Sequence, residues 1–185
     1  MRRLVLSGLC FCLAALSGAA HAQPFDTQRL FSRGAWSVEM THDTADGDLW
    51  CVAATRNARG QFFALTAFDS GSIALLVTDP GRQLTPRAVR FLVDIDYSRW
   101  TIEGTARDIG VSIVMNDAPQ AARFIRQLQR GNAVAVLNDP GQRLATFSLR
   151  GSWAAITALM TCWNRITPPG GSTDPFGPPS ADPFQ

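Results

Sequence analysis

The chain has 185 residues, of which 46% are hydrophobic, and its 17 basic side chains, all of them arginine, nearly balance 15 acidic ones. Such a chain lacks the excess of positive charge that binding to nucleic acid or to an anionic membrane surface requires. Its length and apolar fraction suit one domain with a hydrophobic core.

The first residues resemble a secretory signal peptide. A short basic start, Met1–Arg3, precedes an apolar stretch over 4–18, and Ala20–Ala22 supplies the small-x-small pattern of a cleavage site. The stretch is short for a membrane span, and no later run is long enough for one. We therefore predict cleavage after Ala22 and a periplasmic or secreted protein with no transmembrane segment. The mature chain would carry no net charge.

Cleavage would leave two of the four cysteines, Cys51 and Cys162. Two thiols in one small exported domain usually pair, because the compartment is oxidising. A bond closing a loop of about 110 residues is worth on the order of 4–5 kcal/mol in the chain-entropy model. We predict that the two cysteines form a disulfide; two buried free thiols are the alternative.

The sequence predicts that most of the domain forms β-strands. Trp36, Val38 and Met40 alternate with polar residues, which indicates a half-buried strand, and Asp46–Gly47 predicts the hairpin turn after it. Similar alternation or continuous apolar runs predict eight more strands. The full set is 35–42, 49–56, 61–68, 72–78, 89–96, 99–107, 110–116, 133–138 and 143–150.

The segment after the seventh strand predicts a helix. Asp117 is placed to cap it, Pro119 lies in its first turn, and Gly131 ends it. Apolar residues recur at i, i+3, i+4 and i+7 from Ala121, so they form one buried face.

Three arginines of this helix, Arg123, Arg126 and Arg130, fall together on its outer face. Guanidinium groups on one face can bind carboxylates or phosphates jointly. We take these residues as the candidate partner-binding surface; an ordinary solvated helix face is the alternative.

A second helix is predicted from Gly151 onward, with Ser152 as its N-cap. Its buried face should present one residue from each helical turn, and Cys162 should lie at the edge of that face. The residues expected on this face are Trp153, Ile156, Met160 and Trp163.

Two similar stretches, 78–84 and 138–144, each contain Asp-Pro-Gly after an apolar strand. Proline fixes φ and glycine accepts positive φ, so both predict a tight type II corner. Convergent turn chemistry explains the likeness more simply than duplication does.

Motifs that carry catalysis are sparse. His42 is the one histidine left after cleavage, and no Gly-x-Ser-x-Gly motif presents a serine nucleophile. Asp94, Asp96 and Glu103 are predicted on exposed strand faces, where they do not converge. The acids of 43–48 lack the spacing of a calcium loop. We predict no cofactor and no metal site.

The segment 167–185 is rich in proline and glycine and cannot form a core, so we predict a disordered tail. Its "DPF" motif occurs at Asp174–Phe176 and Asp182–Phe184. A docking peptide is one interpretation of the repeat, and chance repetition is the other.

The early Trp36-x-Val38 strand, the strand cysteine Cys51 and the closing segment "FSLRGSWAAITALMTCW" resemble the invasion-associated locus B family of small exported bacterial proteins. That resemblance implies a β-rich protein of the periplasm or cell surface, linked in some members to host-cell invasion. It implies no catalytic residues.

Together these patterns predict a β-rich α+β domain over 23–166, an antiparallel sandwich or curved barrel of about nine strands with two packed helices. We expect a monomeric, non-catalytic binding or adaptor protein that contacts another envelope or surface protein. The alternative is a small hydrolase or transferase using carboxylates and arginines.

Overall fold

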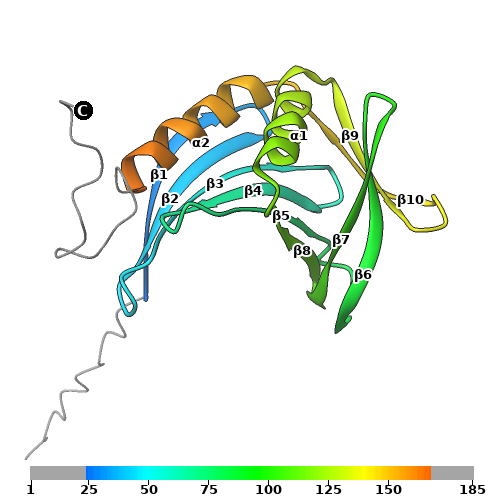
Figure 1. Ribbon diagram of the computed structural model, residues 1–185, viewed down its shortest axis with the longest axis horizontal. Helices are drawn as coiled ribbons and strands as arrows, with labels where there is room; N and C mark the ends of the chain where they lie inside the picture. The colour runs from blue at the N-terminus through cyan, green and yellow to red at the C-terminus, as the bar shows by residue number, and fades with distance from the viewer. Residues whose placement is uncertain (1–23, 168–185) are drawn as a thin grey trace, which may run out of the picture.

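The computed structural model describes residues 24–167, within which the chain forms ten strands and two helices (Figure 1). The strands are β1 (Phe25–Arg33), β2 (Trp36–Asp43), β3 (Leu49–Arg56), β4 (Phe62–Phe68), β5 (Ile73–Thr78), β6 (Leu84–Ile95), β7 (Ser98–Asp108), β8 (Gly110–Val114), β9 (Ala133–Asn138) and β10 (Arg143–Ser148). The helices are α1 (Ala118–Arg130) and α2 (Ser152–Ile166). The predicted signal peptide and the "DPF" motifs lie outside the described residues.

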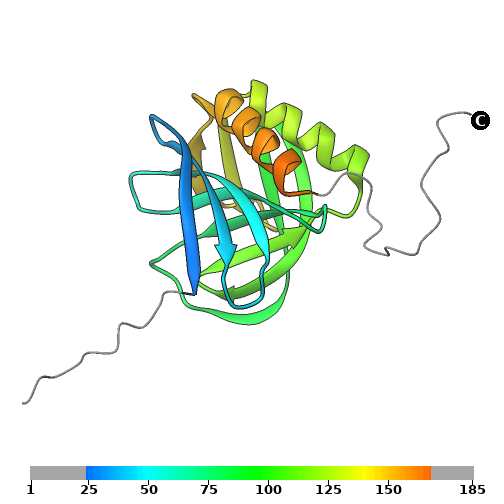
Figure 2. The ribbon, with the colours of Figure 1, turned by 90° about the vertical axis from the view of Figure 1, so that its left-hand side faces the viewer.

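All ten strands form one antiparallel sheet, in the order β1-β2-β3-β4-β5-β8-β7-β6-β9-β10. The sheet bends strongly without closing into a barrel, and both helices lie on its concave side (Figures 1 and 2). The predicted β-rich α+β class is confirmed, with a single curved sheet as its form.

β1 is the strand that the sequence patterns missed. It pairs with β2 along its length, with a bulge between Arg29 and Phe31. Most of its side chains are exposed, and only Leu30 and Phe31 are half-buried. The alternation of apolar and polar residues by which strands are recognised is therefore weak in this segment.

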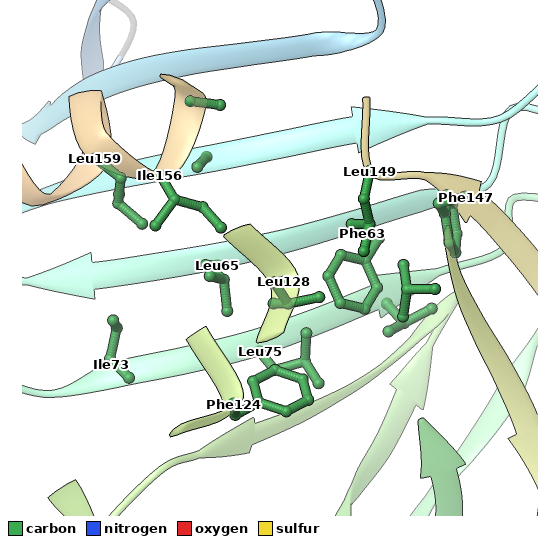
Figure 3. Close-up of a cluster of buried hydrophobic side chains, with 14 of the residues drawn as sticks. Phe63, Leu65, Ile73, Leu75, Phe124, Leu128, Phe147, Leu149, Ile156 and Leu159 are labelled. Atoms are coloured by element: carbon green, nitrogen blue, oxygen red, sulfur yellow. The ribbon is translucent and has the colours of Figure 1, made fainter. Parts of the chain in front are cut away.

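The core lies between the concave face of the sheet and the two helices (Figure 3). Each large side chain buried there contributes on the order of 1.5–3 kcal/mol to folding. The buried residues labelled in the figure come from β4, β5, β10 and the segment after it, and from both helices: Phe63, Leu65, Ile73, Leu75, Phe147, Leu149, Phe124, Leu128, Ile156 and Leu159.

Helix α1 begins and ends where the sequence predicts. The Asp117 carboxylate accepts a hydrogen bond from the backbone N–H of Gln120 at 3.0 Å. At the other end, Gly131 has an ordinary negative φ, so positive φ is not what requires glycine there. A Cβ at that position would come within 2.8 Å of the Leu149 side chain and 2.9 Å of Ile95, so close packing requires it.

The start of α2 differs from the prediction. Gly151, at φ 96°, is the N-cap, and Ser152 is buried with its hydroxyl donating to the Leu128 carbonyl at 2.6 Å. This bond ties α2 to α1 and sets the rotation of the helix. Trp153 consequently faces outward and is 64% exposed, so its predicted burial was wrong. Ala155 lies on the buried face instead.

Cys51 of β3 and Cys162 of α2 form the predicted disulfide, with their Cα atoms 6.2 Å apart. Both residues are buried. The bond pins the last helix across the strands that form early in the chain. A neighbouring indole reinforces it, because Trp163 Nε1 donates to the Phe68 carbonyl at 2.9 Å.

Neither Asp-Pro-Gly segment forms the type II turn that the sequence predicted. Gly141 has the expected positive φ of 90°, but it is the last residue of its turn, because its N–H donates to the Asn138 carbonyl. Gly81 has no positive φ. Its N–H donates instead to the Asp79 carboxylate at 3.1 Å, and this side-chain bond holds the corner.

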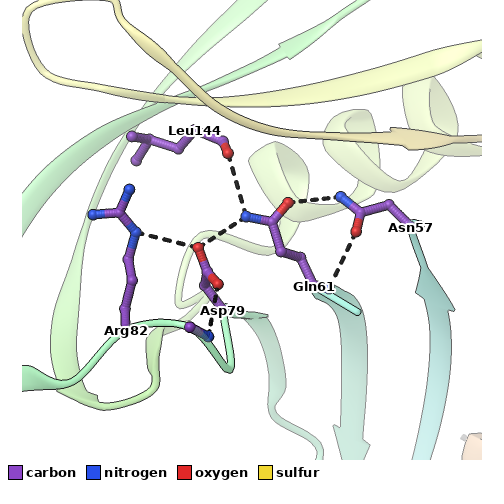
Figure 4. A network of polar contacts seen from close by, with 6 residues as sticks. Asn57, Gln61, Asp79, Arg82 and Leu144 are labelled. Carbon is purple, nitrogen blue, oxygen red and sulfur yellow. Dashed lines mark hydrogen bonds and ion pairs between the residues drawn. The ribbon is translucent and has the colours of Figure 1, made fainter. Parts of the chain in front are cut away.

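A polar network holds the β10 side of the sheet against the β3–β4 and β5–β6 turns (Figure 4). The buried Gln61 side chain donates to the Asp79 carboxylate at 2.9 Å and to the Leu144 carbonyl at 3.3 Å. Asn57 donates to Gln61 at 2.7 Å and to the Thr146 carbonyl at 3.2 Å. Side chains thus satisfy carbonyl groups along β10.

Removing the disulfide should destabilise the domain without changing its fold. In the double variant Cys51→Ala/Cys162→Ala, we expect the free energy of unfolding to fall by about 2–5 kcal/mol, because the unfolded chain regains the entropy of a long loop. Urea denaturation measures this change. Wild-type protein under reducing conditions is the matched control and should behave alike. A double variant as stable as the oxidised wild type would contradict the prediction.

Candidate functional site

The three predicted arginines line a groove of about 460 Å³ between α1 and the β6–β7 hairpin. We call it the arginine groove, and its lining residues used below are Arg123, Arg126, Gln127, Arg130, Trp100 and Asp96. Sequence reasoning placed the arginines on one face, but it did not place β7 or the hairpin turn beside them.

Helix periodicity presents the arginines outward. Ala121, Phe124 and Leu128 are buried against the core, so the residues between them face solvent. All three arginines are exposed. Among the described residues, none of the three forms an ion pair, whereas four other arginines do. Their guanidinium groups are therefore free of carboxylate partners within that part of the chain.

The floor of the arginine groove is a rigid pair of side chains. Trp100 of β7 is half-buried, and its Nε1 donates to Gln127 Oε1 at 2.6 Å. The Trp100 ring also packs edge-to-face against Phe124 with the centroids 5.3 Å apart. The packing on Phe124 fixes the Trp100 ring, and the hydrogen bond from that ring fixes the Gln127 amide oxygen. The direction of the Gln127 amide N–H groups is therefore fixed as well.

Asp96 joins the hairpin to the end of α1. Its carboxylate accepts hydrogen bonds from the backbone N–H of Asn132 at 2.7 Å, from the Asn132 side chain at 3.1 Å and from the backbone N–H of Ala133 at 3.1 Å. The Asn132 backbone bond is the main reason that the pKa of Asp96 lies below its usual value of 3.8, and the loss of some surrounding water opposes the shift. A charged Asp96 therefore holds this wall of the arginine groove.

The tip of the same hairpin is an exposed tyrosine. Tyr97 is 98% exposed, and it lies between Asp96 and Ser98, which both line the arginine groove. The two-residue turn gives Asp96 a φ of 46° and Tyr97 a φ of 74°. Such φ values suit glycine or asparagine far better than tyrosine. Sequence reasoning missed Tyr97, although a tyrosine in a tight turn was a visible signal.

The acids considered for catalysis serve structural roles here. Asp94 accepts the Tyr97 N–H at 2.9 Å and pairs with Arg99 at 3.4 Å, so it stabilises the hairpin turn. Glu103 lies opposite Arg90 across β6 and β7. His42 is exposed at the end of β2. The described part of the chain brings none of these acids together with His42.

Residues 24–167 contain neither a metal-binding cluster nor a helix that could cross a membrane. No group of three or more histidine, cysteine, aspartate or glutamate side chains within 24–167 is arranged to hold a metal ion. Neither helix among these residues has both the length and the apolar character needed to cross a membrane.

Comparison with known proteins identifies no relative: no family model, no curated protein and no solved structure matches the chain.

The role of Asp96 predicts a pH dependence. Because its folded pKa is depressed, its stabilising contribution is full above the unfolded value of 3.8 and is lost as the pH falls through the folded value. Asp96→Asn should therefore melt below wild type at pH 6, and the difference should shrink at pH 3. Thermal melts at the two pH values measure this.

The matched control is Asp46→Asn, which removes an exposed carboxylate from the β2–β3 turn. It should follow the wild type at both pH values. An Asp96→Asn variant that differs from wild type equally at pH 6 and pH 3 would exclude the ionised carboxylate as the source of stability.

Proposed function

We propose that this chain is an exported, non-catalytic binding or adaptor protein of the periplasm or cell envelope, which contacts an acidic surface of a partner protein through the arginine groove. The observation that carries the proposal is the set of three exposed arginines that share one groove and form no ion pair among the described residues. Planar guanidinium groups bind carboxylates in a directed, bidentate manner.

The surroundings of the arginines suit a protein partner. Interface hot spots are enriched in tryptophan, tyrosine and arginine. Trp100 and the arginines of α1 line the groove, and Tyr97 lies in the turn between its lining residues Asp96 and Ser98. Trp100 and Gln127 are held in place before binding, so little ordering of these side chains would oppose association. Asp96 is engaged by backbone N–H groups and leaves the arginines to the partner.

The strain at Tyr97 supports the same proposal. A tyrosine at positive φ raises the energy of the folded state by about 1–2 kcal/mol relative to glycine. Folding gains nothing from its exposed ring. An exposed aromatic residue kept in an unfavourable turn is typical of a residue retained for contact rather than stability.

Export and family membership belong to the proposal as well. The disulfide supports an oxidising compartment. The resemblance to the invasion-associated locus B family extends the proposed partners to proteins at the bacterial surface or on a host cell.

Neutralising the arginines should abolish partner capture. We expect Arg123→Ala/Arg126→Ala/Arg130→Ala to lose the proteins that wild type retains in pull-downs from the native envelope, because the directed carboxylate contacts disappear. The control is Arg59→Ala/Arg107→Ala/Arg143→Ala, which removes three exposed arginines elsewhere on the surface.

A truncation after Ile166 separates the arginine groove from the tail. The truncated protein should keep its partners. If it loses them while the Arg123→Ala/Arg126→Ala/Arg130→Ala variant keeps them, the arginine groove is not the contact surface.

Tyr97→Gly should separate stability from binding. Glycine accepts the positive φ of the turn, so we expect the free energy of unfolding to rise by about 1 kcal/mol. Partner capture should weaken, because the exposed ring is lost. Urea denaturation and the same pull-down report the two effects. A variant that is stabilised and still binds as wild type would remove Tyr97 from the proposed interface.

A further inference from the structure

A second cavity lies on the inner side of the curved sheet, where strands β5 to β10 wrap round. It has a volume of about 280 Å³, and no residue of either helix lines it. It shares no lining residue with the arginine groove. The two sites are therefore separate.

The wall of this inner pocket is apolar. Its innermost lining residues are buried and apolar, and they project from strands that lie side by side in the sheet. The buried wall residues are Val77, Phe91, Ala106, Val136 and Ala145. A largely apolar wall with a few polar groups is the usual character of a small-molecule site.

Small residues keep the inner pocket open. Ala106 and Ala145 fill little of the space that the bend of the sheet leaves. Gly110 lies where a Cβ would come within 2.8 Å of the Val77 carbonyl oxygen. Larger residues at these positions would either fill the hollow or push β5 and β8 apart.

One cation faces this apolar wall without a carboxylate partner. Arg87 lies opposite Ala106 in the β6–β7 ladder, and alternation puts it on the same side of β6 as Val89 and Phe91. Among the described residues, the one hydrogen bond that its guanidinium donates is to the Thr85 carbonyl, at 3.2 Å.

The other two arginines at the inner pocket are already neutralised. Arg82 pairs with Asp79 at 3.2 Å, within the network that Gln61 completes (Figure 4). Arg90 pairs with Asp139 at 2.7 Å. The pocket therefore presents one net positive charge, that of Arg87, beside an apolar hollow.

We propose that the inner pocket binds a short single-chain carboxylic acid, with the hydrocarbon chain against the apolar wall and the carboxylate on the Arg87 guanidinium. The small volume favours a chain of medium length over a two-chain lipid. Charge complementarity favours an acid over an alcohol or an amine, because an arginine and a carboxylate form a directed, charge-assisted pair.

The test measures binding of decanoate by isothermal titration calorimetry at concentrations where decanoate does not form micelles. We expect a dissociation constant below about 1 mM for the wild type and at least about tenfold weaker binding of 1-decanol. Arg87→Gln should weaken decanoate binding by about tenfold or more. Arg107→Gln is the matched control, since Arg107 is the next residue along β7 from Ala106 and faces the other side.

Val89→Phe tests the location, because a larger ring at this half-buried position fills the inner pocket. It should abolish decanoate binding while circular dichroism shows an unchanged fold. Equal affinity for decanoate and 1-decanol, binding unaffected by Arg87→Gln, or binding that survives Val89→Phe would each overturn the proposal. These results are independent of whether the arginine groove captures a protein.

Discussion

The burial of one wide, curved apolar face under two short helices governs the rest of this structure. α2 lies across β1 to β4, and α1 packs beside it, so the helices cover one part of the inner face. The part of β5 to β10 that lines the inner pocket has no helix residue against it and is enclosed by the bend of the sheet. The inner pocket is what remains where that bend is too narrow for a helix and the side chains are too small to fill it.

Polar contacts complete what hydrophobic burial leaves open. Trp36 Nε1 donates to the Ser148 carbonyl at 3.2 Å, and the Gln61 network reaches the carbonyl groups of β10. These side-chain hydrogen bonds hold β10, an edge strand of the sheet, in place without the strand pairing that a closed barrel would supply. The two candidate sites consequently face different environments. The arginine groove lies on the outside of α1, and the inner pocket lies within the bend.

Regular periodicity made part of this architecture predictable. The strands from β2 onward, α1 with its Asp117 cap, and the shared face of its arginines follow from the spacing of apolar residues. The exposure of Trp153 did not, because the bond between Ser152 and Leu128 sets the rotation of α2 and leaves no local trace. The arginine groove also needed the β6–β7 turn beside α1, a contact between distant segments that Asp96 secures.

The long separation of Cys51 and Cys162, 111 residues, carries a consequence for the order of folding. The hairpins of β2 to β4 join neighbouring segments and can form from short-range contacts as the chain emerges. The apolar inner face of these hairpins stays exposed until α2, the last element described, has been synthesised and packs on it. That interval is when the nascent chain is most open to aggregation, and the covalent link marks its end.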